Sequence, residues 1–266
     1  MNELYCVLHK DPGYSREKTA AFLAGERCID LSEAAAAVKA APGFLLENSS
    51  LGKASAFNLR ASAYGLETVL LSHEDLQSPP PAMTVSKVEL KTEGFYYVYG
   101  SVKEHASFEA VRMITACAFD IEVPVKEPAV MEAGLIATIR ARYFPFALPI
   151  GEKYHKPGTA PLPPAPVRET VFLADIFTGG PAPLRLHIPC DEQDYSGIGP
   201  QKTVSSLENF RILLDELSAR SFGTRRNAFL DALLKKEPLG PLKYPTVEAY
   251  EKELVWLTTV LPPKGE

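Results

Sequence analysis

Apolar and polar positions are most clearly patterned between Asp30 and Ser72, where they predict helix, strand, helix and strand in succession. Asp30 is a helix-capping residue with Glu33 three positions later, the arrangement of a capping box. The alanine-rich run that follows meets Pro42-Gly43, a pair that ends helices. We therefore expect the first of these helices to begin at Asp30 and to stop before Pro42.

The second half of this stretch has the same kind of boundaries. Phe44 to Glu47 suits a short buried strand, and Ser49 or Ser50 opens the next helix. Gly65 ends that helix, and Glu67 to Leu71 returns as a strand. The helix is expected to bury one face, made of Ala54, Phe57, Ala61 and Tyr64.

The residues before Asp30 add one strand and one helix. Leu4 to His9 is a compact apolar run typical of a buried strand. Ser15 is placed to cap a helix that stops at Gly25. The resulting order predicts three strands covered on one face by helices, an α+β arrangement.

A proline-rich segment at residues 79–84 predicts a stiff linker, because prolines favour an extended polyproline conformation. We place a domain boundary here, between residues 1–78 and 85–266. With 266 residues the chain is long enough for two domains of ordinary size.

Beyond the linker the pattern favours strands and then helices. Turn residues at 92–94 and 178–181 predict two hairpins, and Asp191 to Pro200 reads as a polar loop. The strands are expected at Val85 to Leu90, Phe95 to Tyr99, Glu109 to Asp120, Val171 to Phe177 and Leu184 to Ile188. Residues 124–166 carry nine prolines and read as an extended insertion, with one short helix at Ala133 to Arg142.

The C-terminal region predicts helices. Ser205 and Glu208 form a capping box, and Gly223 marks the end of that helix. Its buried face is expected to consist of Leu207, Phe210, Leu214 and Leu217. Further helices are expected from Arg226 to Lys236 and after Thr246. Strands followed by an amphipathic helix are also the order of a pleckstrin-homology-like domain, so this topology is one interpretation of residues 85–266.

Composition narrows the class of protein. The net charge of −5 argues against a general nucleic-acid binder, whose binding domain is usually basic. The N-terminus lacks the pattern of a signal peptide, and Arg140 and Arg142 interrupt the longest apolar stretch, so we expect no transmembrane segment. The four cysteines are scattered without a C-x-x-C spacing, which indicates reduced thiols in a cytoplasmic protein.

The stretch IDLSEAAAAVKAAPGFLLENSSLGKASAFNLRASAYGLETVLLS resembles the C-terminal domain of the bacterial ribosomal stalk protein. The family pattern is a Leu-x-Glu-Ala helix, an Ala-Pro stop, a short strand, a helix rich in small residues, a glycine and a final strand. The resemblance covers residues 1–76, about a quarter of the chain. Because adaptor subunits of Clp proteases share this fold, it implies a protein-binding platform.

The sequence departs from the stalk domain where that domain contacts translation factors. Glu26-Arg27-Cys28-Ile29 replaces its glycine-rich loop, and alanines occupy positions 35–37 of the following helix. Lys39 and Lys53 are the lysines nearby. The resemblance therefore does not carry translation-factor binding to this chain.

His187, Cys190 and Asp194 are the candidates for catalysis. A thiol beside an imidazole and a carboxylate supplies a nucleophile, a base and an orienting group if the three converge. Catalytic cysteine and histidine usually come from distant segments, which favours a polar strand end instead. The five histidines have no spacing that presets a metal site, and no phosphate-binding loop is evident, so we expect neither metal nor cofactor.

A basic and aromatic group of residues within the insertion is the candidate binding surface: Arg140, Arg142, Tyr143, Lys153 and Lys156. Cations interleaved with aromatic rings suit an anionic surface, either lipid headgroups or an RNA single strand with stacked bases. The alternative is that the rings pack inward and the charges are only solvated.

Three hypotheses about function follow. The first is a non-enzymatic adaptor or scaffold that binds another protein, based on the stalk-like module and the stiff linker. The second is peripheral binding of anionic phospholipid through the insertion. The third is a hydrolase or transferase that uses Cys190 and His187.

Overall fold

The computed structural model describes residues 3–123, 167–180 and 182–260, and it shows an α+β protein, as the sequence predicts. Of these residues, 3–120, 170–180 and 182–260 belong to one compact unit. The predicted insertion at 124–166, its short helix and the basic and aromatic residues within it lie outside the described residues.

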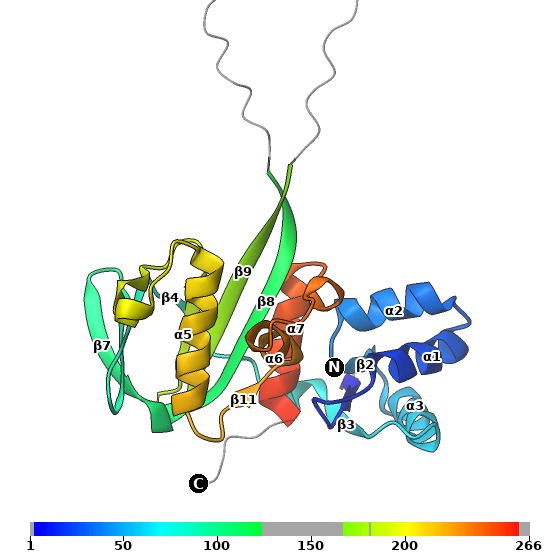
Figure 1. Ribbon diagram of the computed structural model, residues 1–266. Coiled ribbons are helices and arrows are strands. Elements are labelled where there is room, and N and C mark those ends of the chain that lie inside the picture. The colour runs from blue at the N-terminus through cyan, green and yellow to red at the C-terminus, as the bar shows by residue number, and fades with distance from the viewer. Residues whose placement is uncertain (1–2, 124–166, 181, 261–266) are drawn as a thin grey trace, which may run out of the picture. The chain divides into compact units, whose positions relative to one another are not determined.

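The N-terminal module, residues 3–76, has the predicted order of strands and helices (Figure 1). Its three-stranded sheet is antiparallel, with β1 between β2 and β3. The elements are β1 Tyr5–His9, α1 Arg16–Arg27, α2 Leu31–Ala40, β2 Phe44–Ser49, α3 Leu51–Ala63 and β3 Thr68–Ser72, followed by the short 3₁₀ helix η1 His73–Asp75.

Most of the predicted helix boundaries in this module are confirmed. The Ser15 hydroxyl accepts a hydrogen bond from the Lys18 amide, and the Asp30 carboxylate accepts one from the Glu33 amide. The predicted stop at Gly25 is wrong, because α1 continues to Arg27 and ends where Cys28 adopts a left-handed conformation. A glycine inside an exposed helix costs only about 1 kcal/mol, too little to end it against favourable packing.

The sheet of the N-terminal module is buried on both faces, not only on the helix-covered face that the sequence predicts. Val7 and Leu45 pack with the helices of the module. Cys6, Leu8 and Phe44 belong instead to the main core of the protein, together with α7 (Val247–Val260). The continuous apolar run of β1 reflects this double burial.

The predicted linker at 79–84 is only partly a linker. Its last residues form β4, Ala82–Thr84, which pairs in parallel with β10, Arg185–Pro189. The three prolines that precede β4 have no amide hydrogen for a sheet, whereas Ala82 to Thr84 do and can pair at an edge. The division into domains 1–78 and 85–266 stays a prediction, and both segments contribute to one core.

Two sheets follow β4. The first is antiparallel and contains β5 Lys87–Leu90, β6 Gly94–Tyr99 and β7 Val102–Ser107. The second has the order β11-β8-β9-β10-β4, with β8 Val111–Val123, β9 Val167–Thr178 and β11 Arg225–Arg226. Antiparallel pairing of β5 with β6, and of β9 with β10, confirms the hairpins predicted at 92–94 and 178–181. The 3₁₀ helix η2, Phe108–Ala110, leads into β8.

The predicted polar loop at Asp191 to Pro200 is wrong in part, because Tyr195–Gln201 forms the 3₁₀ helix η3. Tyr195 and Ile198 of this helix are buried. Gly197 lies so close to β5 that a Cβ would meet the carbonyl oxygen of Val88 at 1.9 Å. Two apolar side chains and one close backbone contact hold the segment against the strand.

The C-terminal helices are α5 Ser206–Arg220, α6 Ala228–Leu234 and α7, with the 3₁₀ helix η4 Gly240–Leu242 before the last (Figure 1). Ser205 and Thr246 cap α5 and α7 as predicted. Leu207 is 38% exposed, which corrects the predicted buried face of α5, and Leu213 is buried in its place. The helix ends before the predicted Gly223.

The predicted start of α6 at Arg226 is also corrected. Arg226 belongs to β11, and Asn227 caps the helix by accepting a hydrogen bond from the Leu230 amide. The Asn227 side chain in addition exchanges hydrogen bonds with the amide and carbonyl of Ala116 in β8, so it extends the pairing of β11 by one position.

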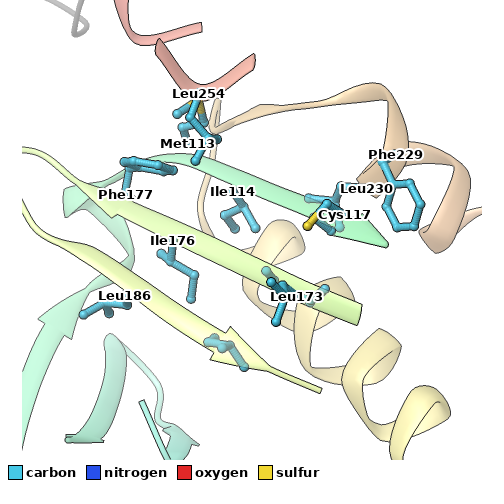
Figure 2. Packing of buried hydrophobic residues seen from close by; sticks show 14 of the residues in the cluster. Met113, Ile114, Cys117, Leu173, Ile176, Phe177, Leu186, Phe229, Leu230 and Leu254 are labelled. Carbon is cyan, nitrogen blue, oxygen red and sulfur yellow. The ribbon is translucent and has the colours of Figure 1, made fainter. Parts of the chain in front are cut away.

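The main core lies between the second sheet and the helices. Figure 2 shows Ile114 of β8, Ile176 of β9 and Leu186 of β10 on adjacent strands, and all three side chains are fully buried. Phe229 and Leu230 of α6 and Leu254 of α7 complete this cluster. Among the helices of the described ranges, none has the length and apolarity needed to cross a lipid bilayer.

Candidate functional site

The three candidates for catalysis have separate partners. The Nδ1 atom of His187 lies 2.9 Å from the Asp175 carboxylate, on the neighbouring strand. Cys190 is buried, and burial raises the pKa of its thiol to about 11. Asp194 is bound by the amide and hydroxyl of Ser196 at the start of η3. The contacts therefore do not bring a thiolate, a base and an orienting carboxylate together.

Asp175 is the centre of a buried polar network that the sequence did not predict. Its carboxylate receives two hydrogen bonds from the Arg185 guanidinium, at 2.9 and 3.1 Å, and one of 2.8 Å from the Tyr250 hydroxyl. Arg185 also binds Glu251. Burial alone would raise the pKa of Asp175, but the hydrogen bonds from His187 and Arg185 keep it below its ordinary value.

The network joins β9 and β10 to α7 and has a structural role. Each oxygen of the Asp175 carboxylate has at least one charged or hydroxyl donor, so the charge is compensated inside the core. Removal of one partner from a buried ion pair commonly costs about 3 to 5 kcal/mol, because the other charge stays buried.

The described residues enclose a pocket of about 300 Å³. It lies where the linker, the β9–β10 turn, β8, β11 and α7 meet. Its walls are mainly apolar side chains and backbone, with two arginines. The lining residues are Gln77, Ser78, Pro80, Arg112, Met113, Phe177, Thr178, Gly179, Gly180, Pro183, Arg225, Leu257 and Thr258.

Arg112, near the start of β8, supplies the first cation of this pocket. Its Nε atom is buried and has no hydrogen-bond partner among the described residues. The side chain lies over Gly179, where a Cβ would come within 2.5 Å of that Nε. Because a buried guanidinium donor without a partner costs free energy, the position suits a ligand with an acceptor.

Arg225 of β11 supplies the second cation. Its strand pairs in parallel with β8, which places Arg225 opposite Met113, the neighbour of Arg112. Burial lowers the pKa of Arg225. The described residues that line the pocket include two arginines and no aspartate or glutamate.

The linker forms one side of the pocket and is fixed to α7. The Gln77 amide donates to the Thr259 hydroxyl at 2.9 Å, and the Thr258 hydroxyl donates to the Gln77 carbonyl at 2.7 Å. This double attachment holds the chain at the pocket edge before the prolines begin.

These features together describe a site for an anionic group attached to an apolar body. Arginine binds carboxylate and phosphate oxygens through its fork of N–H donors, and apolar walls bind the remainder of such a ligand. The sequence analysis did not single out either arginine, and the one local signal is the position of Arg112 between the buried residues Val111 and Met113. No local pattern links Arg112 to Arg225, which is 113 positions later.

The sequence-predicted binding residues Arg140, Arg142, Tyr143, Lys153 and Lys156 lie outside the described residues. Within the part of the chain that the structure describes, no three histidine, cysteine, aspartate or glutamate side chains gather to hold a metal ion. Comparisons with protein-family models, with curated proteins and with solved structures found no match to this chain.

Proposed function

We propose that this protein is a non-enzymatic adaptor that binds another protein, and that the pocket of Arg112 and Arg225 receives an anionic group of the partner. The observation that carries the proposal is a mainly apolar cavity with two arginines and no acidic residue in its wall. A site of this composition favours recognition over bond making, since it offers charge and shape but no activated nucleophile.

The N-terminal module supports the adaptor part of the proposal. Its strand order and antiparallel sheet are compatible with the resemblance to the stalk-protein and Clp-adaptor fold, which remains a proposal together with the pleckstrin-homology-like interpretation of the later strands. The outer surface of its helices exposes Leu31, Leu51, Leu59 and Tyr64. Large apolar side chains exposed to solvent in this module favour contact with a protein.

The pocket can be tested with a pair of dyes that differ in charge. Anilinonaphthalene sulfonate carries an anion on an apolar body, and N-phenylnaphthylamine is its uncharged analogue. We expect Arg112→Gln and Arg225→Gln to weaken binding of the sulfonate by about tenfold each, because a hydrogen bond to a charged group contributes about 1.5 to 3 kcal/mol. Binding of the uncharged dye should change little.

Arg60→Gln is the matched control, since Arg60 lies in an exposed ion pair with Glu26 of the N-terminal module. Equal sulfonate binding by all four proteins would overturn the role of the pocket. The adaptor role is tested by affinity capture with the full chain. A stoichiometric partner should be recovered with wild type and with Arg60→Gln, and lost with the double pocket variant. Capture of no such partner by wild type would count against an adaptor.

A further inference from the structure

A second cleft, of about 400 Å³, lies between the N-terminal module and the C-terminal helices. The segment Pro12 to Arg16 forms one wall, and residues of α6 and α7 form the other. Tyr14 and Trp256 contribute aromatic rings, which meet edge to face with centroids 5.5 Å apart. This cleft shares only Leu257 with the arginine pocket and is a separate site.

Glu253 of α7 lines this cleft, and only one of its two carboxyl oxygens accepts hydrogen bonds from described residues. Its Oε2 accepts a hydrogen bond of 2.9 Å from the Asn227 amide and a short one from the Tyr244 hydroxyl. No described residue donates a hydrogen bond to Oε1. The orientation of the Asn227 amide is fixed in turn by its bonds to Ala116 and to the Leu230 amide. Two fixed donors therefore leave Oε1 as the free acceptor.

Arg16 is the nearest cation to that free oxygen. Its NH2 atom lies 4.0 Å from Glu253 Oε1, which is too far for a hydrogen bond. The Arg16 side chain is 30% exposed, so it can reach a ligand in the cleft. The other arginine of the wall, Arg226, is occupied by Asp231 at 2.9 Å. The cleft thus presents one open acceptor beside a guanidinium, which contacts the Tyr14 hydroxyl and has further N–H donors for a ligand.

We infer that this cleft binds a primary amide, whose N–H donates to Glu253 Oε1 and whose carbonyl oxygen accepts from Arg16. An anionic ligand would face the Glu253 carboxyl, and a cationic ligand would face Arg16, so a neutral group with a donor and an acceptor on neighbouring atoms fits both. The rings of Tyr14 and Trp256 suit a flat or apolar group next to the amide. The amide could belong to a small molecule or to an asparagine or glutamine side chain of a peptide.

Trp256 provides the measurement, because it is the single tryptophan of the chain and lines the cleft. Its fluorescence and its indole N–H resonance are followed while benzamide, acetophenone or benzoate is added to the full chain. We expect saturable binding of benzamide, with acetophenone and benzoate at least about tenfold weaker because the first lacks the donor and the second is an anion. Acetylglutamine methylamide is added in a separate titration, and it tests whether the cleft binds the primary amide of a glutamine side chain.

Glu253→Gln gives the sharpest test. Asn227 and Tyr244 require an acceptor at their position, so the new side chain turns its oxygen toward them and its NH2 toward the cleft. The preference should then reverse, with acetophenone bound more tightly than benzamide. Glu248→Gln, an exposed change on the same helix, should leave the wild-type order unchanged. Equal binding of benzamide and acetophenone by wild type, or an unchanged order in Glu253→Gln, would overturn the inference.

Arg16→Met is the second variant, because Arg16 is on the surface and its loss should not prevent folding. The variant removes the donor to the carbonyl oxygen of the ligand, and we expect its affinity for benzamide to fall by about tenfold. Undiminished benzamide binding by Arg16→Met would also overturn the inference, even if Glu253→Gln failed to fold.

Discussion

The indole Nε1 of Trp256 donates a 2.7 Å hydrogen bond to the main-chain carbonyl of His9, 247 positions earlier in the chain. Both residues are buried. The His9 ring stacks on Tyr14 with centroids 3.9 Å apart, and Tyr14 in turn meets the Trp256 ring edge to face. These contacts join the N-terminal module to α7.

Replacement of Trp256 by phenylalanine should therefore destabilise the whole compact unit. The variant leaves the His9 carbonyl without its donor and opens a cavity in the core, so we expect a loss of about 2 kcal/mol or more. Urea denaturation followed by circular dichroism measures the change. A loss of that size with one cooperative transition agrees with a shared core. An early separate transition of the module would contradict it.

Gly43→Ala should lower the unfolding free energy more than the replacement of Trp256 by phenylalanine. Gly43 has φ of +81°, which an L side chain rarely adopts, and a Cβ there would lie 2.0 Å from Cδ2 of Trp256. Strain and overlap together should cost roughly 3 kcal/mol. Gly25→Ala is the matched control, since the added methyl group meets nothing within 4 Å inside α1. That control should be neutral or stabilising by up to about 1 kcal/mol in thermal unfolding.

The sequence predicted elements with local boundaries and missed contacts between distant ones. Caps such as Ser15, Asp30 and Ser205 lie within three residues of the amides they bind, so they could be found by inspection. The register of the β9–β10 hairpin places His187 directly opposite Asp175. The turn predicted at 178–181 does not give this register, because counting outward from it pairs Asp175 with Leu184.

The two pockets could not be predicted in the same way. Arg112 and Arg225 line the same pocket because β11 pairs with β8, and β11 is a strand of only two residues without an apolar pattern of its own. Glu253 reads as an ordinary charged position of an amphipathic helix. Its burial follows from contacts with Asn227 and Tyr244, which lie in different segments. Sites that depend on tertiary contacts of this kind have no local signature.

Acid should destabilise the protein through His9. Burial lowers the pKa of His9 from its ordinary 6.5 to about 4, and the raising effects of the Glu67 carbonyl and Asp11 are smaller. The unfolded chain therefore binds the proton more readily. The stability from neutral His9 is complete above about pH 6.5 and is lost as the pH falls toward 4.

His9→Phe keeps a ring against Tyr14 but cannot titrate. We expect the unfolding free energy of wild type to fall relative to this variant by up to about 3 kcal/mol between pH 6.5 and 4. Urea titrations at a series of pH values measure the difference. Parallel curves for the two proteins would show that His9 does not titrate in this way.

Glu253 should make the stability of the protein depend on pH in the opposite direction to His9. Burial raises its pKa, although the hydrogen bonds from Asn227 and Tyr244 and the charge of Arg16 oppose the shift. Protonated Glu253 contributes stability that is complete below its pKa in the unfolded chain, about 4.3. This stability is lost as the pH rises through the raised pKa of Glu253 in the folded protein. Wild type should therefore lose stability relative to Glu253→Gln as the pH rises from 4.

The two proteins will also differ in unfolding free energy by an amount that does not depend on pH, because the new amide changes the contact with Arg16. That part of the difference does not test the titration of Glu253. Only the change of the difference with pH tests the titration. A difference that stays level between pH 4 and 8 would mean that Glu253 ionises normally in the folded protein.

Gly179→Ala should separate ligand binding from stability at the arginine pocket. The added Cβ would come within 2.5 Å of Arg112 Nε, whereas the Gly179 backbone does not have the positive φ that would strain an alanine. We expect the arginine to swing away from the pocket at a cost to stability below about 1.5 kcal/mol, because its side chain is flexible. Binding of anilinonaphthalene sulfonate should fall by about tenfold, in line with Arg112→Gln.

Gly52→Ala, an open position in α3, is the control and should leave dye binding unchanged. If Gly179→Ala bound the dye as wild type does while Arg112→Gln did not, the arginine would reach the ligand from another orientation than the one in this structure.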